Sequence, residues 1–421
     1  MSLLSAFNNN RINFFFVSIF SLFPVVLLLG SAAINIVIVI IDVFFLYKLY
    51  VTKNFNYLNN KFFYSLLIFW IYLIINLFFS LNFEGSISRS FGFVRFIIFT
   101  FSIRYFFNEI DNDARKLILN SWTIIFFIVS FDLIFEYILG YNILGFSSYM
   151  PGRLSSFLNQ ELKIGHFYSA FILIFLCNLH NYFYSKKVTY FNHNIFWLCV
   201  ILSISISIMI GERSNFFKVF IMIIIFIFLI NKENLLKKII SISIALGIFS
   251  LIILNNPSYK HRYWHFFVKP VFNNPVKFVL NTDYGSHYLV AIEVFKNHKF
   301  FGVGLKNYRL EVQKEKYDKN ASVHPHQIHF EVIAELGLVG YIFFISILAF
   351  NIYFSFKYFL KKGGKLQLSG LLFVIATLIP IIPSGSFFTT FGAALFWLNY
   401  SFMLPKGTNI LPLMQNKQIN K

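Results

Sequence analysis

The stretch Ser214–Asn231, SNFFKVFIMIIIFIFLIN, decides the fold class. It contains a single charged residue, and an apolar run of about 20 residues is long enough to cross the hydrocarbon core of a bilayer as an α-helix. Comparable runs recur along nearly the whole chain of 421 residues, of which 57% are apolar and 13% are charged. The composition therefore predicts an all-α polytopic membrane protein.

A sliding window of about 19 residues predicts twelve transmembrane helices. They cover residues 13–30, 32–51, 62–81, 87–107, 117–139, 164–183, 192–210, 214–231, 236–255, 329–356, 366–383 and 386–404. Residues 1–255 are thus expected to hold helices one to nine, 256–328 a large loop, 329–404 helices ten to twelve, and 405–421 a tail. The first run lacks a signal-peptide cleavage pattern and is expected to be a retained helix.

The cations of the short loops predict that both termini are cytoplasmic, because Lys and Arg are enriched in cytoplasmic loops. With the N-terminus inside, the cytoplasmic side receives Arg11, Lys48, Lys53, Lys61, Lys186, Lys187, Lys232, Lys237, Lys238, Lys357, Lys361, Lys362 and Lys365. The short outer loops receive very few. The large loop then faces outward.

The large loop 256–328 holds eleven Lys and Arg against five Asp and Glu, and seven of the ten histidines lie in it or at its edge. Long translocated segments ignore the positive-inside bias, so the lysines need no special explanation. The histidine cluster does. The chain has no Walker-type phosphate loop, and an outward-facing site has no ATP to use. Any group transfer there must use a donor that was activated before its export.

Three sequence patterns carry a family resemblance. From His326 the chain reads His-Gln, nine residues, then GLVG to Gly340, which resembles the H-[NSQ]-x9-G-x-x-G signature of the bacterial O-antigen ligase and polymerase family. GERSNF, residues 211–216, is similar to its arginine motif, and FFGVGLKNYR, residues 300–309, is similar to its G-x-G-x-x-x-[FY] segment. The resemblance extends over most of the chain from residue 89 to residue 341. The loop also follows the ninth of twelve helices, as in the ligases.

The resemblance implies a metal-independent glycosyltransferase of the GT-C type without a cofactor. Such enzymes transfer a glycan from undecaprenyl diphosphate to an acceptor at the periplasmic face of the bacterial inner membrane. The expected partners are this lipid-linked donor, a lipid A-core or glycan acceptor and membrane lipids, and no nucleic acid.

The sequence does not identify the acceptor, so the enzyme can be a ligase, a polymerase or a protein O-glycosyltransferase. The x9 spacing of the histidine motif and the position of the loop favour a ligase. A flippase for lipid-linked sugars is the alternative from another class. It is disfavoured because transporters place polar residues near the bilayer midplane, whereas this chain places them at the outer rim.

His326 is the candidate general base. Proline suits the first position of a helix, so Pro325 is expected to open the tenth span and to place His326 in its first turn. The positive helix N-terminus would keep the imidazole neutral, as a base near pH 7 requires. The alternative is a capping histidine at the interface. We interpret His324 and His329 as parts of the site wall and expect no metal site.

Helical spacing places His329 on the face of His326 and places Glu331 and Glu335 on the opposite side. Carboxylates inside a span are costly and are usually paired or functional. We expect both to be structural partners of cations such as Arg89 or Arg95. Gly337 and Gly340 are expected to permit close helix packing. Cys177 and Cys199 lie inside apolar segments and imply no disulfide.

Arg213 is the candidate for binding the donor diphosphate, because a guanidinium holds phosphate oxygens in a bidentate fork. The alternative is an interfacial arginine that extends to lipid headgroups. Arg309 and Lys306 are second candidates. His287 stands where many relatives carry a second loop arginine. We expect Arg309 or Arg262 to take the place of that arginine.

Further cations are predicted near the outer face. Arg89, Arg95 and Arg153 are candidate walls of the donor cavity, since charges at the membrane edge mark sites by default. The alternative is that they form inter-helix salt bridges with Glu84 or Glu161.

Overall fold

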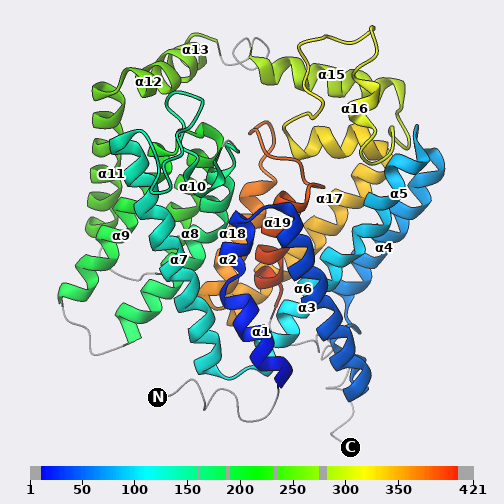
Figure 1. Ribbon diagram of the computed structural model, residues 1–421, viewed down its shortest axis with the longest axis horizontal. Helices are drawn as coiled ribbons and strands as arrows, with labels where there is room; N and C mark the ends of the chain where they lie inside the picture. Colours follow the sequence, from blue (N-terminus) through cyan, green and yellow to red (C-terminus); the bar gives the residue numbers. More distant parts are fainter. Residues whose placement is uncertain (1–10, 160, 186–189, 231–234, 275–281, 406–421) are drawn as a thin grey trace, which may run out of the picture.

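The computed structural model describes residues 11–159, 161–185, 190–230, 235–274 and 282–405, and these ranges contain helices and no strand (Figure 1). The first half of the chain forms α1 (Arg11–Ser21), α2 (Phe23–Leu28), α3 (Ser31–Thr52), η2 (Phe55–Tyr57), α4 (Lys61–Asn76), η3 (Leu77–Phe79), α5 (Phe83–Gly92), α6 (Val94–Glu109), α7 (Asn112–Leu139), η4 (Ser156–Leu158), α8 (Ile164–Ser185) and α9 (Tyr190–Met209). The second half forms α10 (Arg213–Ile230), α11 (Leu235–Asn255), α12 (Pro257–Tyr259), η5 (Lys260–Val268), α13 (Lys269–Asn273), α15 (Asp283–Asn297), α16 (Tyr308–Glu311), α17 (Ile328–Lys362), α18 (Lys365–Thr377) and α19 (Thr390–Met403).

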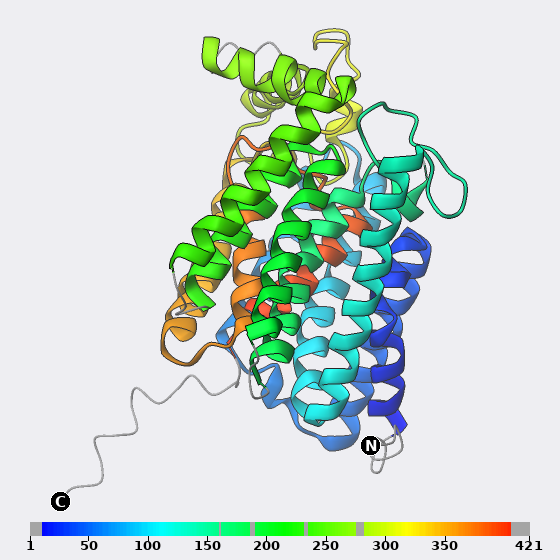
Figure 2. The same ribbon diagram turned by 90° about the vertical axis from the view of Figure 1, so that its left-hand side faces the viewer.

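The prediction of a polytopic helical membrane protein is confirmed. Eight of the described helices are long and apolar enough to cross a membrane, and the apolar helices His193–Met209 and Lys365–Thr377 are shorter. The count of twelve spans and the cytoplasmic termini stay predictions. The helices run roughly parallel, and α12, α13, α15 and α16 lie together at one end of the bundle, opposite the start of α1 (Figures 1 and 2).

The predicted span 366–383 is wrong in its second half. α18 ends at Thr377, and residues 378–389 are not helical before α19 begins at Thr390. Pro380 and Pro383 explain this, because each lacks the N–H that would continue a helix. The predicted span 13–30 is likewise divided at Leu22 into α1 and α2, with Pro24 in the first turn of α2.

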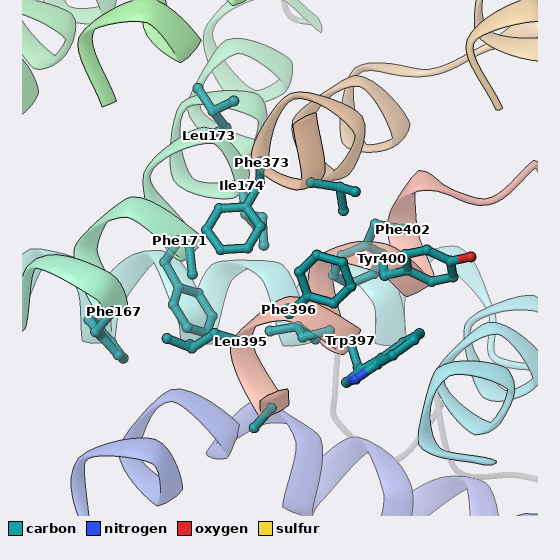
Figure 3. Close-up of a cluster of buried hydrophobic side chains, with 14 of the residues drawn as sticks. Phe167, Phe171, Leu173, Ile174, Phe373, Leu395, Phe396, Trp397, Tyr400 and Phe402 are labelled. Atoms are coloured by element: carbon teal, nitrogen blue, oxygen red, sulfur yellow. The ribbon is translucent and has the colours of Figure 1, made fainter. Parts of the chain in front are cut away.

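α19 is the centre of the bundle. All of its residues from Ala393 to Met403 are buried, and it packs against α6, α8 and α18. Figure 3 shows its side chains interleaved with phenylalanines of α8 and α18. A Cβ on Gly370 of α18 would lie 2.3 Å from the carbonyl oxygen of Asn399, so glycine at this position is what lets the two helices approach. A helix that is apolar on all sides is expected in such a core position.

Gly337 interrupts α17. Its φ of 67° is left-handed, and a Cβ there would lie 2.3 Å from the carbonyl oxygen of Phe300. Segment 299–304 occupies this break. The N–H of Leu338 donates to the carbonyl oxygen of Lys299 at 2.8 Å, and the N–H of Gly304 donates to the main-chain carbonyl oxygen of Glu335 at 2.8 Å. The expectation of close helix packing is therefore wrong for Gly337, which accommodates a loop backbone. It holds for Gly340, which faces Tyr72 of α4.

The segment between α11 and α17 contains a small core of its own. Val290, Val294, Val303, Tyr308 and Tyr317 are its main members, and the first turns of α17 contribute Ala334. Beside this core lies the fully buried Glu311, which accepts a hydrogen bond from Tyr317 at 2.9 Å. Lys314, Lys316 and His298 lie within 2.5, 3.2 and 3.5 Å of its oxygens.

These contacts give the pKa of Glu311 an unusual value. Burial alone would raise the pKa of the carboxyl, but hydrogen bonds from Lys314, Tyr317 and Lys316 lower it from 4.5 to about 2. A carboxyl whose pKa is lower in the folded protein stabilises the fold above its unfolded pKa of 4.5. This stabilisation is lost as the pH falls through the folded value near 2.

Glu311→Gln is therefore expected to loosen segment 283–317. Hydrogen bonds to a charged group contribute roughly 1.5–3 kcal/mol, so amide hydrogen exchange there should rise about tenfold to a hundredfold at pH 7. The measurement is hydrogen–deuterium exchange of the full chain followed by mass spectrometry. Glu315→Gln, at an exposed carboxylate four residues away, is the matched control. Equal exchange in both variants would contradict this role of Glu311.

Candidate active site

A cavity of about 1030 Å³ opens among α5, α8, α10, η5, α15, the start of α17 and residues 381–396. Eight Lys and Arg side chains from the described ranges line it, against three Glu, an excess of five positive charges. The cations are Arg89, Arg153, Lys163, Arg213, Lys218, Arg262, Lys306 and Arg309. Such a cavity is suited to an anionic ligand.

His326 lines this cavity, but not from a helix. The prediction that Pro325 opens the helix is wrong, because α17 begins at Ile328 with Gln327 as its cap. The Gln327 side-chain oxygen accepts from the N–H groups of His329 at 2.6 Å and Phe330 at 3.1 Å. The Gln327 side chain thus caps the free N–H groups at the start of the helix, which a proline at the first helical position would not do. His326 precedes the cap, so it shares no helical face with His329.

The backbone of His326 has a φ of 54°, a left-handed value that is uncommon for any residue except glycine. Two hydrogen bonds hold it there. Its N–H donates to Nδ1 of His324 at 2.9 Å, and its carbonyl oxygen accepts from the N–H of Ser384 at 2.7 Å. Strained conformations of this kind cluster at functional sites and persist where the surroundings fix them.

The environment of the His326 ring lowers its pKa from 6.5 to about 4. Burial is the largest cause, and repulsion from His324 and His287 adds to it. The centroids of these two rings lie 5.0 and 5.3 Å from that of His326. The expected neutral imidazole therefore agrees with the structure, but burial and neighbouring histidines, rather than a helix terminus, are the cause.

Glu331 is turned toward the site, not away from it. Its buried carboxylate lines the cavity and lies 3.3 Å from Nε2 of His324. It also accepts hydrogen bonds from the hydroxyl of Ser386 and, at 2.8 Å, from the N–H of Phe387. Because Nδ1 of His324 accepts from the main chain, its Nε2 carries the proton when the ring is neutral, and this proton faces Glu331.

Glu335 also lines the cavity, where its Oε1 accepts from the N–H of Lys306 at 3.0 Å. The expected partnership with Arg89 or Arg95 is wrong for Glu331, whereas Glu335 interacts electrostatically with Arg89 without forming a salt bridge. Within the described ranges neither carboxylate forms an ion pair with these arginines, and their partners are His324 and main-chain N–H groups.

Arg213 lies where α10 starts and lines the cavity. Its Nη1 donates to the carbonyl oxygens of Arg262 at 3.3 Å and Phe266 at 3.2 Å, both in the π-helix η5. Arg262 in turn donates from Nη2 to the carbonyl oxygen of Gly211 at 3.2 Å. Gly211 has a φ of 76° and leaves no room for a Cβ beside Gly152. The start of α10 and η5 therefore hold each other, with two guanidiniums at the cavity.

Arg153 and its neighbours form a second part of the wall. Arg153 is ion-paired with Glu212 and donates to the carbonyl oxygen of Leu162 at 2.8 Å. Arg153 therefore forms a salt bridge, as the alternative interpretation predicted, but with a different partner. The predicted partner, Glu161, pairs with Lys163 at 2.9 Å.

Three of the ten predicted site residues do not line this cavity. Arg95 lines a smaller cavity next to it. The ring centroid of His287 lies 5.3 Å from that of His326, and its Nδ1 accepts from the N–H of Ser322 at 3.1 Å. His329 contacts the hydroxyl of Tyr341 at 3.1 Å and the carbonyl oxygen of Leu378 at 2.8 Å, which makes it a packing residue.

Sequence reasoning missed Lys218 and His166, which both line the cavity. Lys218 donates from α10 to the carbonyl oxygen of Pro383 at 3.2 Å. It is the one charge in the quoted apolar run, and a charge inside a span is itself a signal of a site. His166 at the start of α8 carried no such signal, because only the tertiary fold brings it to the cavity.

A metal site was not expected, and in the described part of the chain no three His, Cys, Asp or Glu side chains are grouped so that they could hold a metal ion. His329 faces Tyr341 and Leu378, so the histidines at 324, 326 and 329 do not converge. Whether the reaction needs a metal stays a prediction.

Residues 198–345 match the family model described as Wzy_C, O-antigen ligase. This segment includes α10, η5, α15, α16 and the first part of α17, and so both His326 and Arg213. No curated protein matched the chain. The resemblance carried by the three sequence patterns is thus confirmed, and residues 198–345 of this polytopic protein are similar to the O-antigen ligase (Wzy_C) family.

Proposed function

We propose that the protein transfers a glycan from undecaprenyl diphosphate to an acceptor hydroxyl at the periplasmic face of the inner membrane, in the manner of an O-antigen ligase. The observation that carries this proposal is the shared cavity. His326, whose ring is a neutral base at pH 7, lines the same space as Arg213, Arg262 and the other cations. A polymerase of the same family is the alternative, since its acceptor also offers a hydroxyl.

Each step of this transfer has a candidate residue. The neutral ring of His326 takes the proton of the acceptor hydroxyl while that oxygen forms a bond to the anomeric carbon of the donor. The bond from this carbon to the diphosphate breaks, and the leaving diphosphate keeps the electron pair. Arg213 and Arg262 stabilise its negative charge, because guanidiniums bind phosphate oxygens through paired N–H groups. The proton on His326 then returns to solvent.

Glu331 and His324 are positioning residues in this mechanism. The carboxylate fixes the His324 ring, and His324 fixes the main chain of His326. Residues 384–387 hold the same group from the other side, because main-chain N–H groups of this segment donate hydrogen bonds to the carbonyl oxygen of His326 and to the carboxylate of Glu331. A base held on two sides in a strained backbone conformation loses little freedom when substrate binds.

The proposed function is tested with purified full-length protein in detergent, an undecaprenyl diphosphate-linked glycan and two separate acceptors. We expect a new glycosidic bond with lipid A-core, detected by mass spectrometry, and an unchanged rate in the presence of a chelator. Product only with a second lipid-linked glycan would instead identify a polymerase. A protein that moves the donor across vesicles and forms no bond would be a flippase. Activity that a chelator removes and Zn²⁺ restores would contradict the metal-independent mechanism.

His326→Ala is expected to lower kcat about 10²–10⁴-fold, the usual contribution of a general base. Donor binding should remain, because the cations on α10 and η5 are unchanged. His265→Ala, which removes an exposed histidine of η5, is the matched control and should keep the wild-type rate. A His326→Ala enzyme as active as the control would eliminate this residue as the base.

The pH dependence of kcat/KM provides a separate test of the base. Because the pKa of His326 is about 4, the neutral ring predominates above that pH, and the acid limb should lie near pH 4 instead of near 6.5. His324→Asn keeps a hydrogen-bond acceptor but removes one of the two repelling rings. Its acid limb should move upward without reaching 6.5, since burial, the larger cause, remains. A wild-type limb near 6.5 would argue against His326.

A further inference from the structure

A second cavity, of about 220 Å³, adjoins the first where α5 meets α6. Its charged lining consists of Arg89, Arg95 and Lys306, and Ser88 and Thr390 add hydroxyl groups. Arg89 and Lys306 also line the large cavity, so the two spaces share a wall. No carboxylate belongs to the described lining of the small cavity.

The three cations of the small cavity form no salt bridge with a described carboxylate, although Asp42 is near enough to Arg95, and Glu335 to Arg89, for an electrostatic interaction. The carboxylate of Glu335 accepts from the main-chain N–H of Lys306, and that of Asp42 accepts from the hydroxyl of Ser102 at 3.2 Å. Nε of Arg95 is buried without a hydrogen-bond partner, and its guanidinium lies 4.6 Å from the ring centroid of Phe96.

Two cations of the large cavity are neutralised by carboxylates. Arg153 has Glu212, and Lys163 has Glu161. Buried charges are normally paired, because removing an unpaired charge from water costs several kcal/mol. Three half-buried cations without a salt bridge around one small space are therefore explained by a ligand that supplies negative charge. Guanidiniums favour phosphate oxygens, which they bind in a bidentate fork, and hydroxyls such as those of Ser88 and Thr390 complete such sites.

We infer that the small cavity is a second anion subsite, which binds a phosphate-type group separately from the Arg213 wall. The two sites lie on different parts of the bundle, since α5 and α10 are on opposite sides of α19 in Figure 1. The inference does not depend on glycosyl transfer. The ligand's phosphate belongs either to a membrane lipid headgroup or to a soluble or glycan-borne molecule, and the same chemistry recognises both.

The test measures binding of radiolabelled inorganic phosphate to the purified full chain in detergent by equilibrium dialysis. Arg95→Gln should weaken one class of sites about tenfold or more, because it removes charge-assisted hydrogen bonds. Arg95→Lys, which keeps the charge, should weaken it less. Arg213→Gln should leave that class intact. Lys116→Gln, at an exposed lysine, is the control, and size-exclusion chromatography verifies that each variant is folded.

Phosphate binding that Arg213→Gln abolishes and Arg95→Gln leaves unchanged would overturn the inference, as would wild-type protein that binds no phosphate. The source of the ligand is then separated in nanodiscs. If phosphatidylglycerol displaces phosphate relative to pure phosphatidylcholine, the subsite binds an anionic lipid headgroup. If it does not, the phosphate is soluble or glycan-borne. The assay contains no donor or acceptor, so its failure and a failure of glycosyl transfer are distinguishable.

Discussion

The site depends on one buried carboxylate. Glu331 lies in the first turn of α17, and it contacts His324 on one side and residues 386 and 387 on the other. These contacts join the segment before α17 to residues 386 and 387, which are distant in sequence. Removing one partner from such a network leaves a buried charge or donor unsatisfied, which costs more than the contact itself contributes. The position of His326 between His324 and Ser384 follows from this arrangement.

The positive charge of the cavity has several structural sources. Arg213 and Lys218 come from α10, Arg262 from η5, and Lys306 and Arg309 from the segment before α17. In a space partly shielded from water each charge has a longer reach than at a surface. An anionic headgroup that enters is therefore attracted from several sides. The apolar bundle around it restricts which part of a lipid-linked molecule can occupy the charged region.

The sequence predicted the helices well, because apolar runs of membrane length have few alternatives. It also identified seven of the cavity-lining residues, including His326 and Arg213. It failed at the start of α17, where Pro325 predicted the first helical position but Gln327 caps the helix two residues later. Pro380 and Pro383 already signalled the end of α18, and Lys218 signalled a site. The approach of His166 and the contacts of Glu331 depend on tertiary packing, which no local pattern encodes.

The central position of α19 has a consequence for biosynthesis. Every other described helix precedes it in the chain, yet α6, α8 and α18 pack directly against it. Membrane helices are inserted first and associate afterwards. The earlier helices therefore lack their central packing partner until residues 390–403 leave the ribosome and enter the membrane.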